Sequence, residues 1–117
     1  MYFGVQGLMP RNLNEVTEAT ITNIRDHGFT GAACRYFEPL ETTESDAKRL
    51  RDIMNVGGVT PCQTVAQHPD LIDPDPDKRA EGVRAMQHMC KVARWLGAGN
   101  LYVRPGSVHP NGSWYAH

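Results

Sequence analysis

The chain has 117 residues, of which 40% are hydrophobic and 21% are charged, and its formal net charge is −1. This length and composition predict one globular domain and argue against disorder. A nearly neutral chain does not produce the positive electrostatic potential that attracts nucleic-acid phosphates, so we expect no nucleic-acid partner. No apolar run approaches the ~20 residues that cross a bilayer, and residues 1–10 lack the basic region of a secretory signal. We therefore expect a cytoplasmic protein without a membrane partner.

The cysteines Cys34, Cys62 and Cys90 stand far apart and form no Cys-x-x-Cys motif. An odd number of cysteines at such spacings favours neither a disulfide framework nor a zinc site. Because a free thiol packs as a small hydrophobe, we expect all three side chains to be buried.

Short apolar runs predict strands at residues 2–5, 31–35, 59–65 and 100–103. The first predicted helix covers residues 14–27, with Asn12 or Asn14 as its N-cap and Gly28 at its end. Steps of three and four predict that its buried face consists of Leu13, Val16, Thr20 and Ile24.

The second predicted helix covers residues 44–56. Thr43 is its expected N-cap, and a pair of glycines at 57 and 58 ends it. Its expected buried face consists of Ala47, Leu50, Ile53 and Met54.

The third predicted helix begins at Pro76, directly after the N-cap Asp75, and ends before Gly97. The wide apolar face typical of a helix on a sheet is expected to consist of one stripe of Val83, Met86, Cys90 and Ala93 and a second of Met89, Val92 and Leu96. The acidic run before the helix has prolines and no glycine, so it predicts a helix-capping turn rather than a calcium loop. Its members are Asp70, Asp73, Asp75 and Asp77.

Strands that alternate with helical segments are typical of βαβ units in a parallel sheet. About four strands and three helices amount to roughly half of a (β/α)₈ barrel. We therefore predict an α/β fold, a partial TIM barrel that forms a single domain over residues 1–117. Its strands should follow the order 1-2-3-4 with the helices on the outer face. The alternative is a flavodoxin-like order, 2-1-3-4, with helices on both faces.

Residues 104–117 are rich in proline, glycine and polar groups and predict a long loop after the fourth strand. Such a loop normally leads into a helix that covers the sheet. We therefore expect the N-terminal half of a larger barrel, ending before strands five to eight. A small open α/β domain is the alternative.

Three segments carry a resemblance to a known family: His27 to Ala32, Ala47 to Met54 with Gly58-Val59, and Ala93 to Ser107. In the last segment, a helix ending in Leu-Gly-Ala leads to a strand and then to Arg104-Pro105-Gly106. In their order and spacing these segments resemble the N-terminal half of the xylose isomerase-like TIM-barrel superfamily. That superfamily contains sugar phosphate isomerases and epimerases.

The resemblance implies metal-assisted proton transfer on a sugar or polyol, with a sugar or sugar phosphate as the small-molecule partner. In the family, acidic and histidine ligands hold a divalent metal, mainly on strands five to eight. This chain has no counterpart of those strands, so no catalytic residue or metal ligand of that constellation is carried over. We expect the isolated chain to show no isomerase turnover. A non-enzymatic α/β binding or interaction module is the alternative function.

Endonuclease IV shares this barrel and has histidine ligands after strands three and four. His68 stands where the first would lie and is our candidate metal ligand, an ordinary loop histidine being the alternative. Arg104 occupies the place of the second, and a guanidinium has no free lone pair. A metal nuclease is the second alternative function, and Arg104 speaks against it.

Active sites of such barrels lie at the carboxyl ends of the strands. This rule selects the candidate substrate-binding residues Arg104, Arg35, Gln63, Gln6 and His109. The guanidinium fork of an arginine suits a phosphate or a carboxylate. Ion pairs are the alternative for both arginines, with Glu38 as the expected partner of Arg35. Trp114 and Tyr115 predict either stacking on a sugar ring or packing in a core.

A half-barrel leaves its first and fourth strands as open edges and exposes the inner face of its sheet. Open edges and apolar patches favour further pairing, so we expect self-association through these edges. If the segment after residue 103 shields the fourth strand, we expect a monomer. The inner-face candidates are Val5, Ala33, Cys62 and Leu101 or Tyr102.

Overall fold

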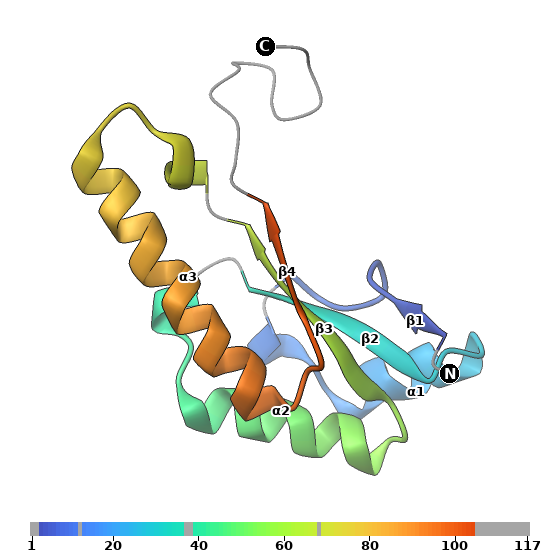
Figure 1. The fold of residues 1–117 in the computed structure, drawn as a ribbon. Coiled ribbons are helices and arrows are strands. Elements are labelled where there is room, and N and C mark those ends of the chain that lie inside the picture. Colours follow the sequence, from blue (N-terminus) through green and yellow to red (C-terminus); the bar gives the residue numbers. More distant parts are fainter. Residues whose placement is uncertain (1–2, 12, 37–38, 68, 105–117) are drawn as a thin grey trace, which may run out of the picture.

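The computed structural model describes residues 3–11, 13–36, 39–67 and 69–104 and confirms the α/β class. Four parallel strands form one sheet in the order β1-β2-β3-β4 (Figure 1). The strands are β1 (Gly4–Val5), β2 (Gly31–Tyr36), β3 (Thr60–Gln67) and β4 (Leu101–Arg104). This sequential order is that of half a (β/α)₈ barrel, and it excludes the flavodoxin-like order.

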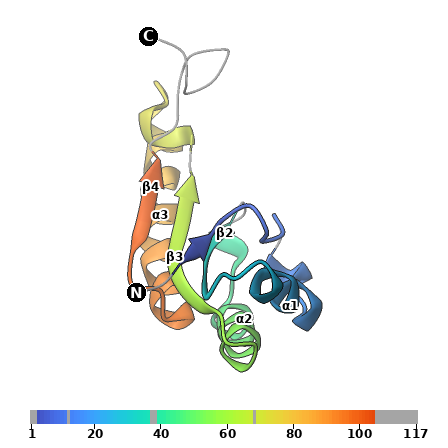
Figure 2. The same ribbon diagram turned by 90° about the vertical axis from the view of Figure 1, so that its right-hand side faces the viewer.

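Three helices follow the first three strands: α1 (Glu18–Asp26), α2 (Glu44–Val56) and α3 (Pro76–Leu96). They lie along one side of the curved sheet (Figure 2). A short 3₁₀ helix precedes each of them, namely η1 (Leu13–Glu15), η2 (Pro39–Glu41) and η3 (Pro69–Ile72). Each βα connection therefore runs through a 3₁₀ turn at the carboxyl edge of the sheet, where the candidate site lies.

The first helix is shorter than the predicted span of 14–27. Neither predicted N-cap begins α1, because η1 ends at Glu15 and the chain enters α1 through Thr17, whose backbone N–H donates to Thr20 Oγ1 over 3.3 Å. The break shifts the helical phase. Ile21 is therefore buried where Thr20 was expected, and Thr20 is half-buried.

The second helix has the predicted bounds. The Thr43 hydroxyl accepts a hydrogen bond from the backbone N–H of Asp46 over 3.2 Å, as its capping role requires. Ala47, Leu50 and Met54 are buried as predicted, while Ile53 is half-buried.

The third helix begins at Pro76 and is capped by Asp75, whose carboxylate accepts from the backbone N–H of Asp77 over 2.8 Å. Gly97 ends it with φ at 78°, a left-handed conformation that suits glycine. The first predicted stripe was wrong for Val83 and Cys90, which are exposed, whereas Ala93 is buried and Met86 packs against the core. A single stripe faces the core instead and consists of Gly82, Ala85, Met89, Val92, Ala93 and Leu96.

Alternation along the strands divides the sheet into two faces. Ala32, Cys34 and Ala66 belong to the core beneath the helices, together with Ile24, Leu50, Met54 and Leu96. Val5 and Leu101 also pack against this core, so assigning Val5 to the inner face was wrong, and Tyr102 rather than Leu101 takes the inner position. Ala33, Arg35 and Val65 alternate along the strands with these core residues of β2 and β3, and they point to the opposite, inner face.

The three thiols differ in environment. Cys34 is buried, Cys62 is half-buried and Cys90 is exposed, so the expectation of three buried thiols was wrong for two of them. Within the described ranges, no helix is long and apolar enough to span a membrane.

Candidate functional site

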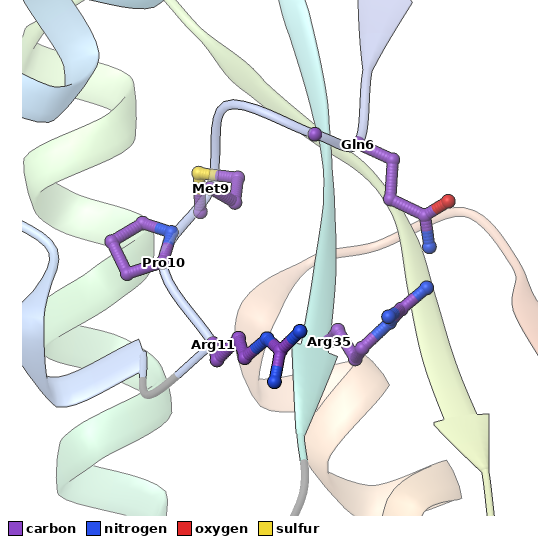
Figure 3. A pocket seen from close by; sticks show the side chains of 6 residues that line it. Gln6, Met9, Pro10, Arg11 and Arg35 are labelled. Carbon is purple, nitrogen blue, oxygen red and sulfur yellow. The ribbon is translucent and has the colours of Figure 1, made fainter.

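A pocket of about 220 Å³ lies at the carboxyl ends of β1 and β2 (Figure 3). Its lining consists of Gln6, Gly7, Met9, Pro10, Arg11 and Arg35. Figure 3 shows the Arg35 side chain extending from β2 toward the Gln6 amide, and the Arg11 side chain extending from the loop toward β2. The pocket thus unites two residues that were predicted from the sequence with one, Arg11, that was not.

Strand alternation places Arg35 in this pocket. Its predecessor Cys34 is buried under the helices, so Arg35 points to the inner face, beside Val65 of β3 in the sheet register. The side chain is half-buried. A strand holds its side chains more firmly than a loop, so β2 fixes the direction from which this guanidinium enters the pocket.

The connection from β1 to η1 supplies the other polar groups. A hydrogen bond of 3.4 Å from the backbone N–H of Met9 to the carbonyl oxygen of Gln6 closes a turn directly after β1. The Met9 side chain is buried and belongs to the core, which anchors the turn on the sheet. Two residues after Met9, the exposed Arg11 reaches back over the pocket.

Arg49 of α2 braces the end of this connection. Its guanidinium donates to the carbonyl oxygens of Leu13 (3.2 Å), Asn14 (3.3 Å) and Val16 (3.4 Å). These carbonyls belong to η1 and the residues that follow it. The contact therefore ties the pocket's loop to the second helix.

The lining of the pocket suits an anion. Among the described residues that form it, two carry guanidinium groups, one carries an amide and none is acidic. Guanidinium groups form short, charge-assisted and often bidentate hydrogen bonds with phosphate and carboxylate. The amide of Gln6 both donates and accepts, which suits a neighbouring hydroxyl group.

The same lining does not fit the divalent metal that the family resemblance implies. Arginine offers no lone pair, and its charge repels a cation. Over the described parts of the chain, no three His, Cys, Asp or Glu side chains come together as a potential metal site. The candidate ligand His68 lies outside the described residues.

Arg104 ends β4 and is paired in register with Gln67 of β3. It lies two residues after Tyr102, on the same face of the sheet as Arg35, with β3 between the two strands. The structure therefore places Arg104 at the predicted carboxyl edge of the sheet. The pocket lies at β1 and β2, whereas Arg104 belongs to β4.

Gln63 lies in the first half of β3 rather than at its carboxyl end. Its amide donates to Asn100 Oδ1 over 2.9 Å, and the Asn100 amide donates to the carbonyl oxygen of Cys62 over 3.1 Å. This pair joins β3 to the start of β4, so Gln63 links strands in the structure and does not line the pocket.

The remaining candidates divide into two groups. The acidic run before α3 is a capping turn, as predicted: Asp73 accepts from the backbone N–H of Asp75 over 2.9 Å, and Asp75 caps the helix. The other group comprises His109, Glu38, Trp114 and Tyr115, which lie outside the described residues.

Arg11 was missed because no sequence motif marks it. The available signal was its position in the connection after the first strand, since loops at the carboxyl ends of strands build the sites of such barrels.

Comparisons with protein-family models and with curated proteins gave no match to this chain. The geometry of the pocket is therefore the basis for a functional proposal.

Proposed function

We propose that this chain binds and orients a small sugar phosphate, as the anion-binding part of an isomerase- or epimerase-like barrel. The observation that carries the proposal is the convergence of Arg11 and Arg35 on one pocket at the carboxyl edge of a parallel sheet. This edge is where enzymes and binding proteins with parallel sheets bind their ligands.

The chemistry of the pocket supports a phosphorylated ligand. Arg35 offers its guanidinium from a strand, and Arg11 offers a second one from a loop. The phosphate would bind the guanidinium groups that line the pocket, and a hydroxyl of the sugar would lie against the Gln6 amide. A volume of about 220 Å³ is below the ~300–1,000 Å³ of pockets for drug-sized ligands, which favours a short sugar phosphate.

Titration calorimetry with a ribulose phosphate and with unphosphorylated ribulose tests the proposal. We expect binding of the phosphorylated sugar, and much weaker binding of the sugar alone. Arg35→Gln should weaken binding by roughly 10–150-fold, the range of one charge-assisted hydrogen bond. Arg11→Gln should cause a smaller loss, because Arg11 is exposed.

A matched control separates local contact from net charge. Arg84 is exposed on α3, so Arg84→Gln removes the same charge far from the pocket and should leave the affinity unchanged. Thermal unfolding checks that each variant is folded. Equal affinities for the two sugars, or an unchanged affinity in both pocket variants, would contradict the proposal.

A non-enzymatic binding module is the second candidate function. The pocket lining favours it, because none of its described residues is a carboxylate, histidine, lysine, cysteine or tyrosine that could move a proton. Isomerases and epimerases exchange a carbon-bound substrate proton, and in heavy water that exchange is visible by proton NMR. Exchange catalysed by the purified chain would favour the enzyme, whereas binding without exchange would favour the module.

A further inference from the structure

Both outer strands of the sheet have one open edge within the described part of the chain. Among the residues that the structure describes, β1 pairs only with β2, and β4 pairs only with β3. The free backbone N–H and C=O groups of an edge strand are a template for pairing with another strand. Both edges run in the same direction, because every pair in the sheet is parallel.

Large apolar side chains are exposed at both edges. Phe3, directly before β1, is 68% exposed, and Tyr102 and Val103 of β4 are 48% and 43% exposed. Proteins usually protect a sheet edge with charges, proline or a covering segment. Residues 3–5 carry no charged side chain, and in β4 the one charged residue is Arg104 at the end of the strand.

We propose that two copies of this chain join their sheets, with β4 of each copy pairing in parallel with β1 of the other. The strand order 1-2-3-4 then continues without interruption from one copy into the next. Two such sheets supply the eight parallel strands with which a barrel closes around a filled interior. Because eight strands complete the barrel, the assembly closes at two copies and does not grow.

The inner face fits this arrangement. On β1 and β2 it carries the small residues Gly4, Gly31 and Ala33, and on β3 and β4 it carries the larger Val65 and Tyr102, while Arg35 and Arg104 lie at its carboxyl edge. Small barrels often fill their interior by alternating small and large side chains. The Cys62 thiol packs closely against the small residues of this face, because a Cβ atom added to Gly31 would lie 3.4 Å from the Sγ of Cys62.

Sedimentation velocity across the micromolar range tests the proposal, and it does not depend on sugar phosphate binding. We expect a concentration-dependent species of twice the 13.0 kDa chain mass, and no larger series. Val103→Lys puts a charge on the β4 edge and should raise the dissociation constant of the dimer at least ~10-fold. Val83→Lys is the matched control, since Val83 is 48% exposed on the helix α3 and not on an edge strand, and should leave the constant unchanged.

Three outcomes would overturn the proposal. The wild-type chain could sediment as a monomer throughout, it could form an open series of larger species, or its dimer could be equally sensitive to Val103→Lys and Val83→Lys. Circular dichroism of both variants checks that they keep the wild-type fold. A second edge variant, Phe3→Lys, applies the same test to the β1 side.

Discussion

The side chain of Ile21 in α1 fills the space in which a Cβ atom on Gly57 would lie. Gly57 is the C-cap of α2, and an added Cβ would fall well inside van der Waals contact with Ile21 Cγ2. Its φ of −80° is one that any residue adopts, so backbone conformation does not require glycine here. The close approach of α1 to the end of α2 is the reason for glycine at this position.

Gly57→Ala should therefore destabilise the fold by about 1–3 kcal/mol, the usual cost of overpacking. Ile21 is only 1% exposed and has little room to move. Chemical denaturation measures the change. Gly99→Ala is the control and should stay within ~0.5 kcal/mol of wild type, because no atom lies within 4 Å of a Cβ there.

A double-mutant cycle tests the cause. Ile21→Leu removes the branch methyl Cγ2, so the cost of Gly57→Ala should be smaller in that background. An equal cost in both backgrounds would show that the contact with Ile21 is not responsible.

Arg49→Met should loosen the connection that carries Gln6 and Arg11. It removes three hydrogen bonds from the guanidinium to backbone carbonyl oxygens while retaining an apolar stem. We expect a loss of about 1–2 kcal/mol in unfolding free energy and weaker binding of a ribulose phosphate. Arg84→Met on α3 is the matched control, and equal effects of the two substitutions would contradict the bracing role of Arg49.

Asp46 makes stability depend on acid pH. Hydrogen bonds from the side chain and the backbone of Thr43 lower the pKa of this carboxyl below its ordinary value of 3.8. A carboxyl with a lowered pKa in the folded state stabilises the protein at pH values above its unfolded pKa, and this contribution is lost as the pH falls through the folded pKa. Asp46→Asn should thus cost about 0.5 kcal/mol near neutrality and progressively less below pH 3.8. A difference between wild type and variant that stays constant across this range would exclude the linkage.

The cysteines should differ in reactivity. Burial, and then the neighbouring Cys62, raise the pKa of Cys34 to about 12, so almost no thiolate forms there near neutral pH. Cys90 is exposed on α3. Brief treatment with iodoacetamide, followed by peptide mass spectrometry, should find Cys90 modified and Cys34 unmodified until urea is added. Modification of Cys34 at the rate of Cys90 in the folded protein would contradict the buried position.

Local sequence signals were sufficient to predict the bounds of α2 and the start of α3, and the order of the elements along the chain. Thr43 and Asp75 cap α2 and α3 as predicted, because a capping hydrogen bond depends only on residues within one turn. The start of α1 was wrong by four residues. Several residues near it were suitable as caps, and packing of η1 against the core and against Arg49 decided among them.

The sequence by itself predicted the α/β alternation, the strand order and the carboxyl edge as the place of the candidate site, since apolar periodicity and connection length express the first two directly and parallel sheets bind ligands at that edge. Only the tertiary structure decided which stripe of α3 is buried and which candidate residues meet. Arg35 and Arg11 are 24 positions apart in the chain, and they converge because β1 pairs with β2 and the loop after β1 folds back over the sheet. Such a convergence depends on contacts between distant segments, and no local pattern in the sequence encodes it.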